Sequence, residues 1–255
     1  RSGPNLSAMA LMSDKSKAKS FMKRAGVPVI PGSDGVLKDV EEARKLANEM
    51  GYPVILKAAA GGGGRGMRLV TKGEDLEKNF WAAESEALSA FGNGSMYIEK
   101  YITNPRHVEV QILGDEHGNV IHVGERDCSM QRRHQKLIEE TPATILDEKT
   151  REKLHETAIA ATKAIGYYGA GTFEFLYDQD SKEFYFIEMN TRLQVEHCVS
   201  EMVSGLDMVE WMIRIAQGEK LPSQDEIEFR GHSIECRIAA EDPKSFAPNR
   251  SEERR

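Results

Sequence analysis

The stretch Val54–Val70, VILKAAAGGGGRGMRLV, places four consecutive glycines between two apolar runs, with Lys57 on the run that precedes them. It contains the spacing G-x-G-x-x-G, but a Rossmann fold requires a helix after the glycines, and here residues 67–70 have the pattern of a strand. It also lacks the Gly-Lys-Ser/Thr that ends a Walker A loop. The stretch therefore predicts a strand, a glycine loop and a second strand, which together form a hairpin flap.

Such a flap can bind nucleotide phosphates through its backbone N–H groups, as in protein kinases, and Lys57 would add a positive charge. The alternative for this stretch alone is a solvated hairpin tip. A protein kinase is disfavoured, because H-R-D and D-F-G are absent and Lys57 precedes the glycine loop instead of following it.

The residues around the flap predict a small α+β unit over roughly residues 30–102. Residues 39–50 have apolar positions at helical spacing and end before Gly51, and a buried strand follows them. Residues 74–91 again predict a helix, and residues 96–102 predict a strand.

The remainder of the chain predicts a larger antiparallel α+β body. Its expected elements are hairpins at residues 107–113 with 120–123 and 171–177 with 184–190, and helices at residues 148–165 and 206–217. Before the flap unit, Ser13 and Asp14 are suited to cap a basic helix that runs to Lys23. Residues 232–238 have a strand pattern.

The second hairpin of this body predicts a metal site. Alternation along a strand places Glu188, Asn190 and Arg192 on one face, and a turn near residues 180–181 sets Glu174 opposite or diagonal to Glu188. Two facing carboxylates repel each other, and a set of oxygen ligands of this kind suits Mg²⁺ or Mn²⁺. The alternative is a pair of glutamates on a solvated sheet face.

The run Arg126–Lys136, RDCSMQRRHQK, concentrates cations in an acidic chain. It predicts either a local anion site or a solvated basic loop. Glu196 and His197 could supply a general base, although a lone glutamate or histidine is more often structural. The sequence contains no Ser-His-Asp arrangement and no H-E-x-x-H motif, so nothing favours a hydrolase.

The composition excludes several classes of protein. The 255 residues carry a net charge of −7, so no overall basic field exists to bind nucleic acid. The cysteines Cys128, Cys198 and Cys236 fall in no C-x-x-C spacing, which disfavours a zinc site or a disulfide framework and fits a reducing cytosol. No apolar run approaches the roughly 20 residues that span a bilayer, so we expect a soluble cytoplasmic protein that binds neither membrane nor nucleic acid.

These features together indicate an ATP-dependent enzyme of phosphoryl chemistry, in which a small flap unit closes on a larger body that carries Mg²⁺ ligands. Six segments, in their order and spacing, then resemble the biotin carboxylase family of ATP-grasp enzymes. They read KAAAGGGGRGM, EKYITNPRHVEVQ, ERDCSMQRRHQK, GAGTFEFL, FIEMNTRLQVEH and GHSIECRIAAEDP. The similarity runs from about residue 3 to residue 248.

The resemblance implies an α+β, ATP-grasp fold. Its expected parts are a leading helix and connection at residues 1–30, a lid subdomain at residues 31–102, and a body at residues 103–255 that includes the truncated start of a carboxylase C-terminal domain. The chain is then expected to be a central fragment, without the family's N-terminal domain and without the end of its C-terminal domain.

The resemblance also implies a role for individual residues. ATP would be bound by Lys15, Lys57, Gly63, Gly64, Glu99, Lys100, Tyr101, Ile102, His107, Gln131, His134 and Leu176. Two ions, Mg²⁺ or Mn²⁺, would be held by Glu174, Glu188 and Asn190. Bicarbonate would be bound by Lys136, Arg192, Gln194 and Val195, with Glu196 as the base that deprotonates it. Arg237 would stabilise the biotin enolate.

The implied function is the ATP-dependent carboxylation of biotin with bicarbonate through carboxyphosphate, with biotin presented by a carrier protein in the parent enzyme. A lone biotin carboxylase subunit, as in acetyl-CoA carboxylase and fatty acid biosynthesis, is the preferred parent. The alternatives are an ATP-binding fragment with little or no carboxylase activity and a kinase-like phosphotransferase. The oligomeric state of the fragment is left open. The chain departs from the family pattern at Ala60, where the lid often has a longer glycine run, and at Cys198, where the family usually has proline.

Overall fold

The computed structural model describes residues 4–59, 66–132, 135–242 and 244–247, and the side chains of Lys15 and Ser16 fall outside that description. The chain divides into two compact units. Unit 1 comprises Arg1–Phe21, Arg106–Phe175 and Glu188–Arg255, and unit 2 comprises Met22–Pro105 and Leu176–Ile187.

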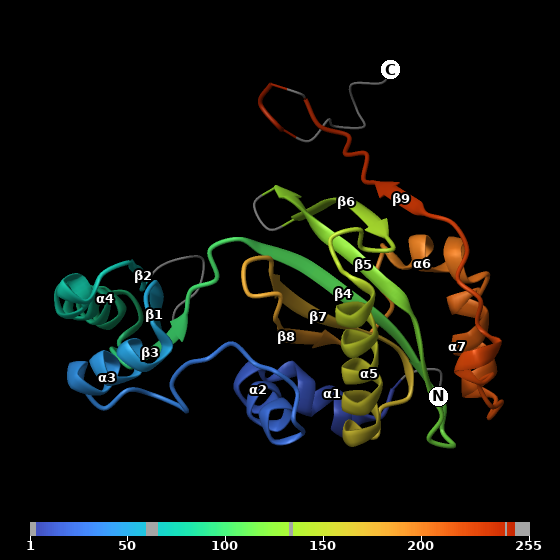
Figure 1. The fold of residues 1–255 in the computed structure, drawn as a ribbon, viewed down its shortest axis with the longest axis horizontal. Coiled ribbons are helices and arrows are strands. Elements are labelled where there is room, and N and C mark those ends of the chain that lie inside the picture. The colour runs from blue at the N-terminus through green and yellow to red at the C-terminus, as the bar shows by residue number, and fades with distance from the viewer. Residues whose placement is uncertain (1–3, 60–65, 133–134, 243, 248–255) are drawn as a thin grey trace. The chain divides into compact units, whose positions relative to one another are not determined.

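A three-stranded antiparallel sheet and two helices make up most of unit 2 (Figure 1). The strands follow the order β2-β1-β3, with β1 at Val54–Ala58, β2 at Met67–Val70 and β3 at Met96–Lys100. The helices are α3 at Val40–Met50 and α4 at Leu76–Phe91, and the 3₁₀ turn η1 at Gly73–Asp75 precedes α4.

Local signals explain where these elements begin and end. The Asp39 side chain accepts a hydrogen bond of 2.8 Å from the backbone N–H of Glu42 and caps α3, and α4 ends at Gly92 with φ of 70°. At the end of the glycine loop, Gly66 has φ of 69°, and a Cβ there would lie 2.7 Å from the Cβ of Ala58. Gly66 is therefore required by both its backbone conformation and its close approach to β1.

The two faces of this sheet differ. Alternate residues Val54, Leu56 and Ala58 of β1 share one buried core with α3 and α4. Lys57 therefore lies on the opposite face, where its register partner is Tyr97 of β3. The helices thus bury one face of the sheet and leave the lysine on the other.

Unit 1 is organised by a six-stranded sheet with the order β8-β7-β4-β5-β6-β9. These strands are β4 at Pro105–Gly114, β5 at Val120–Arg132, β6 at Gln135–Thr141, β7 at Gly169–Asp178, β8 at Phe184–Asn190 and β9 at Ser233–Cys236. The helices of the wider chain are α1 at Leu6–Ser13, α2 at Lys15–Arg24, α5 at Glu148–Ile165, α6 at His197–Ser204 and α7 at Met208–Ala216, with the 3₁₀ turn η2 at Gln224–Glu226. The pairs β4–β5, β5–β6 and β6–β9 are antiparallel.

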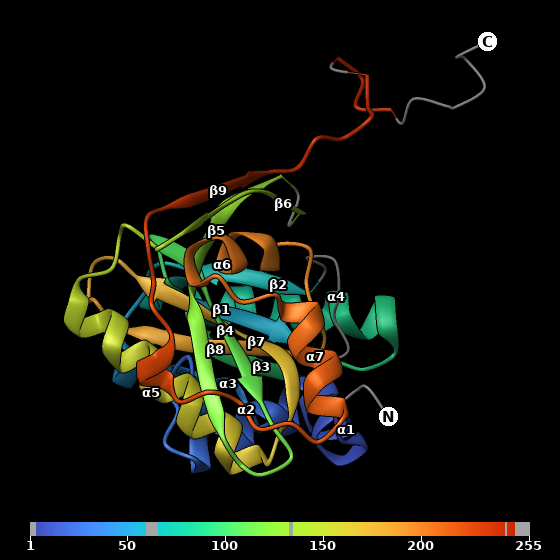
Figure 2. The same cartoon turned by 90° about the vertical axis from the view of Figure 1, so that its right-hand side faces the viewer.

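A bulge in β5 decides which side chains face which helix. The register of β4 and β5 shifts between Val110 and Ile112, and Gly124 in the facing part of β5 has φ of 79°. Because the bulge interrupts the alternation, both His122 and Glu125 contact His155 of α5. Arg126 points to the opposite face and contacts α6. Figure 2 shows α5 on one side of these strands and α6 and α7 on the other.

The predicted α+β class with antiparallel sheets is confirmed, and so are the strand after the glycine loop and the helices over residues 40–50, 76–91 and 148–165. The interpretation of residues 126–136 as a solvated loop is wrong, because the described residues of this run belong to β5 and β6. The glycine bulge breaks the period of two that would have revealed a strand as long as β5. The short helices α1 and α6 were also not predicted. Among the described residues, no helix combines the length and apolar character that crossing a membrane demands.

Candidate active site

One face of the large sheet carries a row of polar side chains. Successive side chains along a strand point to opposite faces, so every second residue of β4 lies on this face. His107, Glu109 and Gln111 project from the same face of β4, and Glu109 pairs in register with Arg126 of β5. Glu109, Gln111 and Arg126 are all fully buried. Charged residues in such a position require partners from neighbouring elements.

Lys136, near the start of β6, is the cation at the centre of this cluster. Its Nζ donates to Glu109, to Glu174 Oε1 at 3.2 Å and to Glu196 Oε1 at 2.6 Å. The three carboxylates come from β4, β7 and the residue before α6. The structure therefore gathers three acidic groups from distant parts of the chain around one ammonium group.

Arg126 lies beneath the cluster and connects it to the core. Its guanidinium donates to five side chains: Gln111, Ser200, Glu109, Thr172 and Gln194. The Gln194 amide in turn donates to Glu174 Oε1 at 3.2 Å. Arg126 thus fixes groups from β4, β7 and α6 relative to one another.

Glu174 is the most heavily bonded carboxylate. His107 Nε2 lies 3.1 Å from its Oε2, and the Asn190 amide donates to its Oε1 at 2.8 Å. Burial would raise the pKa of Glu174, but the hydrogen bonds and charges of His107 and Lys136 outweigh burial and lower the pKa to about 2. Glu174 is therefore ionised at neutral pH.

Glu196 is bound from two sides. Lys136 bonds its Oε1, and Arg237 Nη2 donates to its Oε2 at 2.9 Å. Burial opposes ionisation, but the Lys136 hydrogen bond and charge hold the pKa of Glu196 below its usual range. Glu196 is therefore a carboxylate at neutral pH, able to accept a proton.

Arg237 also bonds Glu139 of β6, which lies opposite Glu235 of β9. Its Nε donates to Glu139 Oε1 at 2.7 Å, and Glu139 faces Glu235 in the cross-strand register. Among the described residues, neither Glu139 Oε2 nor Glu235 Oε2 has a hydrogen-bond partner. Burial raises the pKa of both groups against the opposing charge of Arg237; the charges of Glu235 and Glu196 raise the pKa of Glu139 further, and the charge of Glu196 raises that of Glu235.

The predicted metal residues fit a hard cation. Glu174 is ionised, and because Asn190 Nδ2 donates to Glu174, its amide oxygen is left for another partner. Glu188 lies two residues before Asn190 on β8, on the same face and half-buried. Carboxylate and amide oxygens are the donors that Mg²⁺ and Mn²⁺ accept. A group formed by His107, Glu109 and Glu174 also brings one ligand atom of each residue within 4.8 Å of the others.

Two predicted bicarbonate residues lie outside the cluster. Arg192 is exposed and donates to the carbonyl of its neighbour Leu193 at 3.3 Å, and Val195 is 62% exposed. Gln131, one of the predicted nucleotide residues, does belong to the cluster, because its amide nitrogen lies 3.3 Å from His107 Nδ1. Lys136, Gln194, Glu196 and Arg237 thus converge, whereas Arg192 and Val195 lie on the surface of the same segment.

The remaining predicted nucleotide residues belong to unit 2 or fall outside the described residues. Lys57 Nζ lies 2.5 Å from Glu99 Oε2, on the sheet face away from α3 and α4. Lys100 Nζ donates to the carbonyls of Gly51 and Tyr52, and the Tyr101 N–H donates to the Pro53 carbonyl. Ile102 is buried and Leu176 of β7 is half-buried. Gly63, Gly64, His134 and the side chain of Lys15 lie outside the described residues, as does Ala60.

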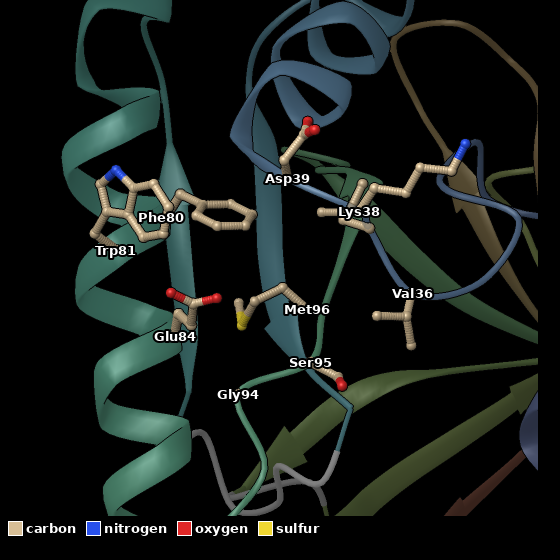
Figure 3. A pocket seen from close by; sticks show the side chains of 10 residues that line it. Val36, Lys38, Asp39, Phe80, Trp81, Glu84, Gly94, Ser95 and Met96 are labelled. Carbon is tan, nitrogen blue, oxygen red and sulfur yellow. The ribbon is translucent and has the colours of Figure 1, made fainter.

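A separate hollow of about 250 Å³ lies within unit 2. Figure 3 shows Phe80, Trp81 and Glu84 of α4 on one side of it and Val36, Lys38 and Asp39 on the other. None of the predicted site residues lines it. It is therefore not the predicted nucleotide site.

Sequence reasoning missed three members of the cluster. Glu109 lies two residues after His107, so strand alternation could have placed it on the same face. Arg126 was noted within the basic run, but its burial was not predicted. Glu139 gave no local signal, because its role depends on Arg237, 98 residues away in sequence.

Comparison with known proteins now identifies the class. The chain matches the family described as "Carbamoyl-phosphate synthase L chain, ATP binding domain" over residues 14–224. It is 59% identical to the biotin carboxylase of Pseudomonas aeruginosa, over 97% of this chain and 55% of that protein. The chain spans about half the length of the curated relatives it matches.

Two solved structures are similar in both sequence and fold. The first is the Campylobacter jejuni biotin carboxylase in complex with β-γ-ATP, at 73% identity and a TM-score of 0.81, covering 97% of this chain and 55% of that chain. The second is the Hydrogenobacter thermophilus 2-oxoglutarate carboxylase biotin carboxylase domain with MgADP, ADP and bicarbonate, at 58% identity and a TM-score of 0.80, with the same coverages of 97% and 55%.

With the two antiparallel sheets, these similarities define the class of the protein as one with the ATP-grasp fold. The chain belongs to the carbamoyl-phosphate synthase L chain, ATP binding domain family, and within it to the biotin carboxylases, as the six sequence segments predicted.

Proposed function

We propose that this chain carries the ATP-dependent step in which bicarbonate is activated and its carboxyl group is transferred to biotin. The observation that supports it most directly is the convergence of Glu196, Lys136 and Arg237, a carboxylate held between two cations. Similar structures contain an ATP analogue in one case and MgADP with bicarbonate in another. The cluster offers the charges that these substrates require.

Nucleotide binding is assigned to the residues that the family resemblance implies. In the proposal, Lys15, Lys57, Gly63 and Gly64 bind the phosphates, Glu99, Lys100, Tyr101, Ile102 and Leu176 bind the adenine and ribose, and His107, Gln131 and His134 complete the pocket. Lys57 suits this role because it lies on the sheet face that α3 and α4 leave uncovered. A lysine in that position neutralises phosphate charge.

Glu174, Glu188 and Asn190 would hold Mg²⁺ or Mn²⁺, two ions when the nucleotide is bound. The ions supply charge neutralisation at the transferring phosphoryl group. The low pKa of Glu174 supports this assignment, because the carboxylate is ready to ligate without first losing a proton.

The acceptor side of the reaction is assigned to Lys136, Arg192, Gln194 and Val195, which bind bicarbonate, and to Glu196, which removes its proton. The O–H of bicarbonate passes its proton to Glu196, and the resulting oxyanion attacks the γ-phosphorus while ADP leaves. A bound anion competes with Glu196 for the Lys136 ammonium group. Loss of that interaction raises the pKa of Glu196 toward the value a base requires.

The second half of the proposed reaction takes place beside Arg237. Carboxyphosphate separates into CO₂ and phosphate, the phosphate takes the proton of the biotin ureido N–H, and the nitrogen of the resulting enolate forms the new bond to CO₂. Arg237 stabilises the enolate oxygen through its guanidinium. In the parent enzyme the biotin is presented on a carrier protein, and we assign the chain to a lone biotin carboxylase subunit of the acetyl-CoA carboxylase type.

A second candidate function is an ATP-binding fragment with little or no carboxylase activity. The observation that favours it is length, since the chain spans about half of each curated relative. Residues beyond the matched half are therefore candidates for completing the biotin side of the reaction.

The test is ATP hydrolysis by the 255-residue chain with Mg²⁺ and bicarbonate, with and without free biotin. The proposal predicts a rate that depends on bicarbonate and rises with biotin, and a loss on the order of 10²-fold or more in Glu196→Gln. Glu125→Gln, on the other face of β5, is the matched control. It should leave the bicarbonate-dependent rate of ATP hydrolysis per folded molecule equal to that of the unchanged chain. Nucleotide binding with no bicarbonate-dependent rate would reject the enzyme and support the binding fragment.

A further inference from the structure

The first five residues of α6 place three different metal-ligating groups together, directly after Glu196. His197, Cys198 and Glu201 each offer one ligand atom, and these atoms all lie within 4.8 Å of one another. The set combines an imidazole nitrogen, a thiol sulfur and a carboxylate oxygen. It is chemically unlike the all-oxygen set of Glu174, Glu188 and Asn190.

His197 is held in the tautomer that a metal requires. Its Nδ1 lies 2.7 Å from the carbonyl oxygen of Gln194. A carbonyl only accepts hydrogen bonds, so Nδ1 carries the proton and, in the neutral ring, Nε2 presents its lone pair. Metal-binding histidines are commonly oriented by such a bond from the second ring nitrogen to a backbone carbonyl.

Glu201 is oriented by the next helix. Its Oε1 accepts a hydrogen bond of 2.7 Å from the backbone N–H of Met208, at the start of α7. The same oxygen lies 3.6 Å from His197 Nε2. Two lone-pair donors at this separation repel each other, and a cation bound between them would remove the repulsion. Tetrahedral zinc with its usual bond lengths sets such a nitrogen and oxygen about 3.4 Å apart.

Cys198 completes the set from an exposed position. Its Sγ lies 3.9 Å from both ring nitrogens of His197, and tetrahedral zinc sets a ligating nitrogen and sulfur about 3.6 Å apart. Burial raises the pKa of this thiol, and Glu235 and Glu201 raise it further, so metal binding must displace a proton. Because Sγ is equidistant from the two ring nitrogens, the exposed Cys198 side chain must rotate toward Nε2 to bind the same ion.

We propose that His197, Cys198 and Glu201 form a binding site for Zn²⁺, with a fourth position left for water or another ligand. Nitrogen, thiolate and carboxylate donors in a tetrahedral set favour Zn²⁺ over Mg²⁺. The cysteine spacing that disfavours a zinc site in the sequence does not apply, because this site needs one cysteine and takes its other ligands from α6. His197 also holds the Gln194 carbonyl, so the bound ion is linked to the turn that carries Gln194 and Glu196.

Titration of the 255-residue chain with Co²⁺ tests the site, with excess Mg²⁺ to occupy oxygen ligands and no nucleotide present. A thiolate-to-cobalt charge-transfer band in the near ultraviolet, with visible bands of tetrahedral intensity, is expected, and Zn²⁺ should abolish both. Cys198→Ser removes the charge-transfer band. His197→Gln and Glu201→Gln each weaken Co²⁺ binding by at least about tenfold.

Cys236→Ser is the matched control, because Cys236 is also exposed and lies on β9. Its spectrum should equal that of the unchanged chain. The proposal is overturned if the unchanged chain gives no band, if Cys236→Ser removes the band, or if His197→Gln and Glu201→Gln bind Co²⁺ as tightly as the unchanged chain, which would indicate a thiol alone.

Alkylation of the unchanged chain provides a second test that needs no variant. Zn²⁺ should slow the reaction of Cys198 with iodoacetamide by at least about tenfold, because the metal-bound thiolate is shielded, and should leave the rate at Cys236 unchanged. Equal protection of both cysteines, or of neither, would count against the site.

Discussion

Two charged networks lie on opposite faces of β5 and invite comparison. On one face, Glu125 accepts from Arg151 Nε at 2.8 Å, from the Ala143 N–H at 3.1 Å, and contacts His155 Nε2 at 2.7 Å. On the other face, Lys136 is shared among three buried carboxylates, those of Glu109, Glu174 and Glu196. Adjacent residues of one strand thus serve two different networks.

The difference between the two faces is how the charged groups are shared. Glu125 is a single carboxylate bonded by both Arg151 and His155, and these bonds lower its pKa despite burial. On the other face, three carboxylates share the Lys136 ammonium group, Arg126 and Arg237 are further partners, and the face includes half-buried Asn190 and Glu188. A network built around one carboxylate and its own partners stabilises a fold, whereas a partly accessible network of shared charges is suited to exchange partners with ions from solution.

The largest expected effect on stability is at Arg126, whose hydrogen bonds connect β4, β7 and α6 beside Lys136. Arg126→Met should lower the free energy of unfolding by about 3–5 kcal/mol, because it leaves Glu109 and four neutral acceptors buried without this donor. Arg132→Met, which removes a partly exposed ion pair with Glu241, should cost less than about 1 kcal/mol. Urea unfolding measures both, and equal losses would remove the special role of Arg126.

Glu125→Gln tests whether the opposite face is purely structural. The change should cost about 2 kcal/mol, because two charge-assisted hydrogen bonds are weakened. ATP-dependent turnover per folded molecule should stay unchanged, in contrast to Glu196→Gln. A loss of turnover without a loss of stability would show that the two faces of β5 are coupled.

His122, on the same face of β5 as Glu125, makes the free energy of unfolding depend on pH. Burial and the charge of His155 lower the pKa of His122 to about 3 from 6.5, although Glu125 opposes this. Between these values the unfolded chain binds a proton that the folded chain does not, so stability falls as pH decreases from 6.5. Each such proton contributes about 1.4 kcal/mol per pH unit.

His122→Phe should flatten that slope by about one proton while keeping the ring stacked against Phe229. The measurement is the free energy of unfolding from pH 7 to pH 4.5 in urea. A slope equal to that of the unchanged chain would show that His122 takes up its proton in the folded state as readily as in the unfolded state.

The smallest effect is expected at Glu235, which faces Glu139 across β6 and β9. Both carboxyl groups have a raised pKa, so their ionisation removes stability as pH rises through the folded-state pKa. Glu235→Gln should stabilise the chain by about 0.5 kcal/mol at pH 8 and by less at pH 5. A gain that is larger at pH 5 would contradict repulsion between the pair.

Several parts of the fold could be predicted because their signals are local. Asp39 and Gly51 bound α3 through capping and a positive φ, and the glycine loop ends in a strand because Met67–Val70 has strand-forming residues and no helical period. The extension of β5 to Arg132 could not be predicted, since Gly124 interrupts the alternation on which the prediction depends.

Site residues that belong to local sequence motifs could be predicted. Site residues whose role depends on contacts between distant parts of the chain could not. Glu174, Asn190 and Lys136 were named from the hairpin and the family resemblance, and the structure brings them together. The cross-strand pair of Glu139 and Glu235 depends on β9 lying beside β6, and no local pattern encodes that neighbour.

The sequence by itself determined the elements around the glycine loop, helix α5, the family and the identity of the charged groups, because propensity, capping and motif spacing act over a few residues. Only the tertiary structure decided that Arg126 is buried, that Lys136 is shared by three carboxylates, and that His197, Cys198 and Glu201 lie at the start of α6 with ligand atoms within 4.8 Å. The physical reason is that charge and hydrogen-bond energies depend on distances in space, which the order of residues along the chain does not contain.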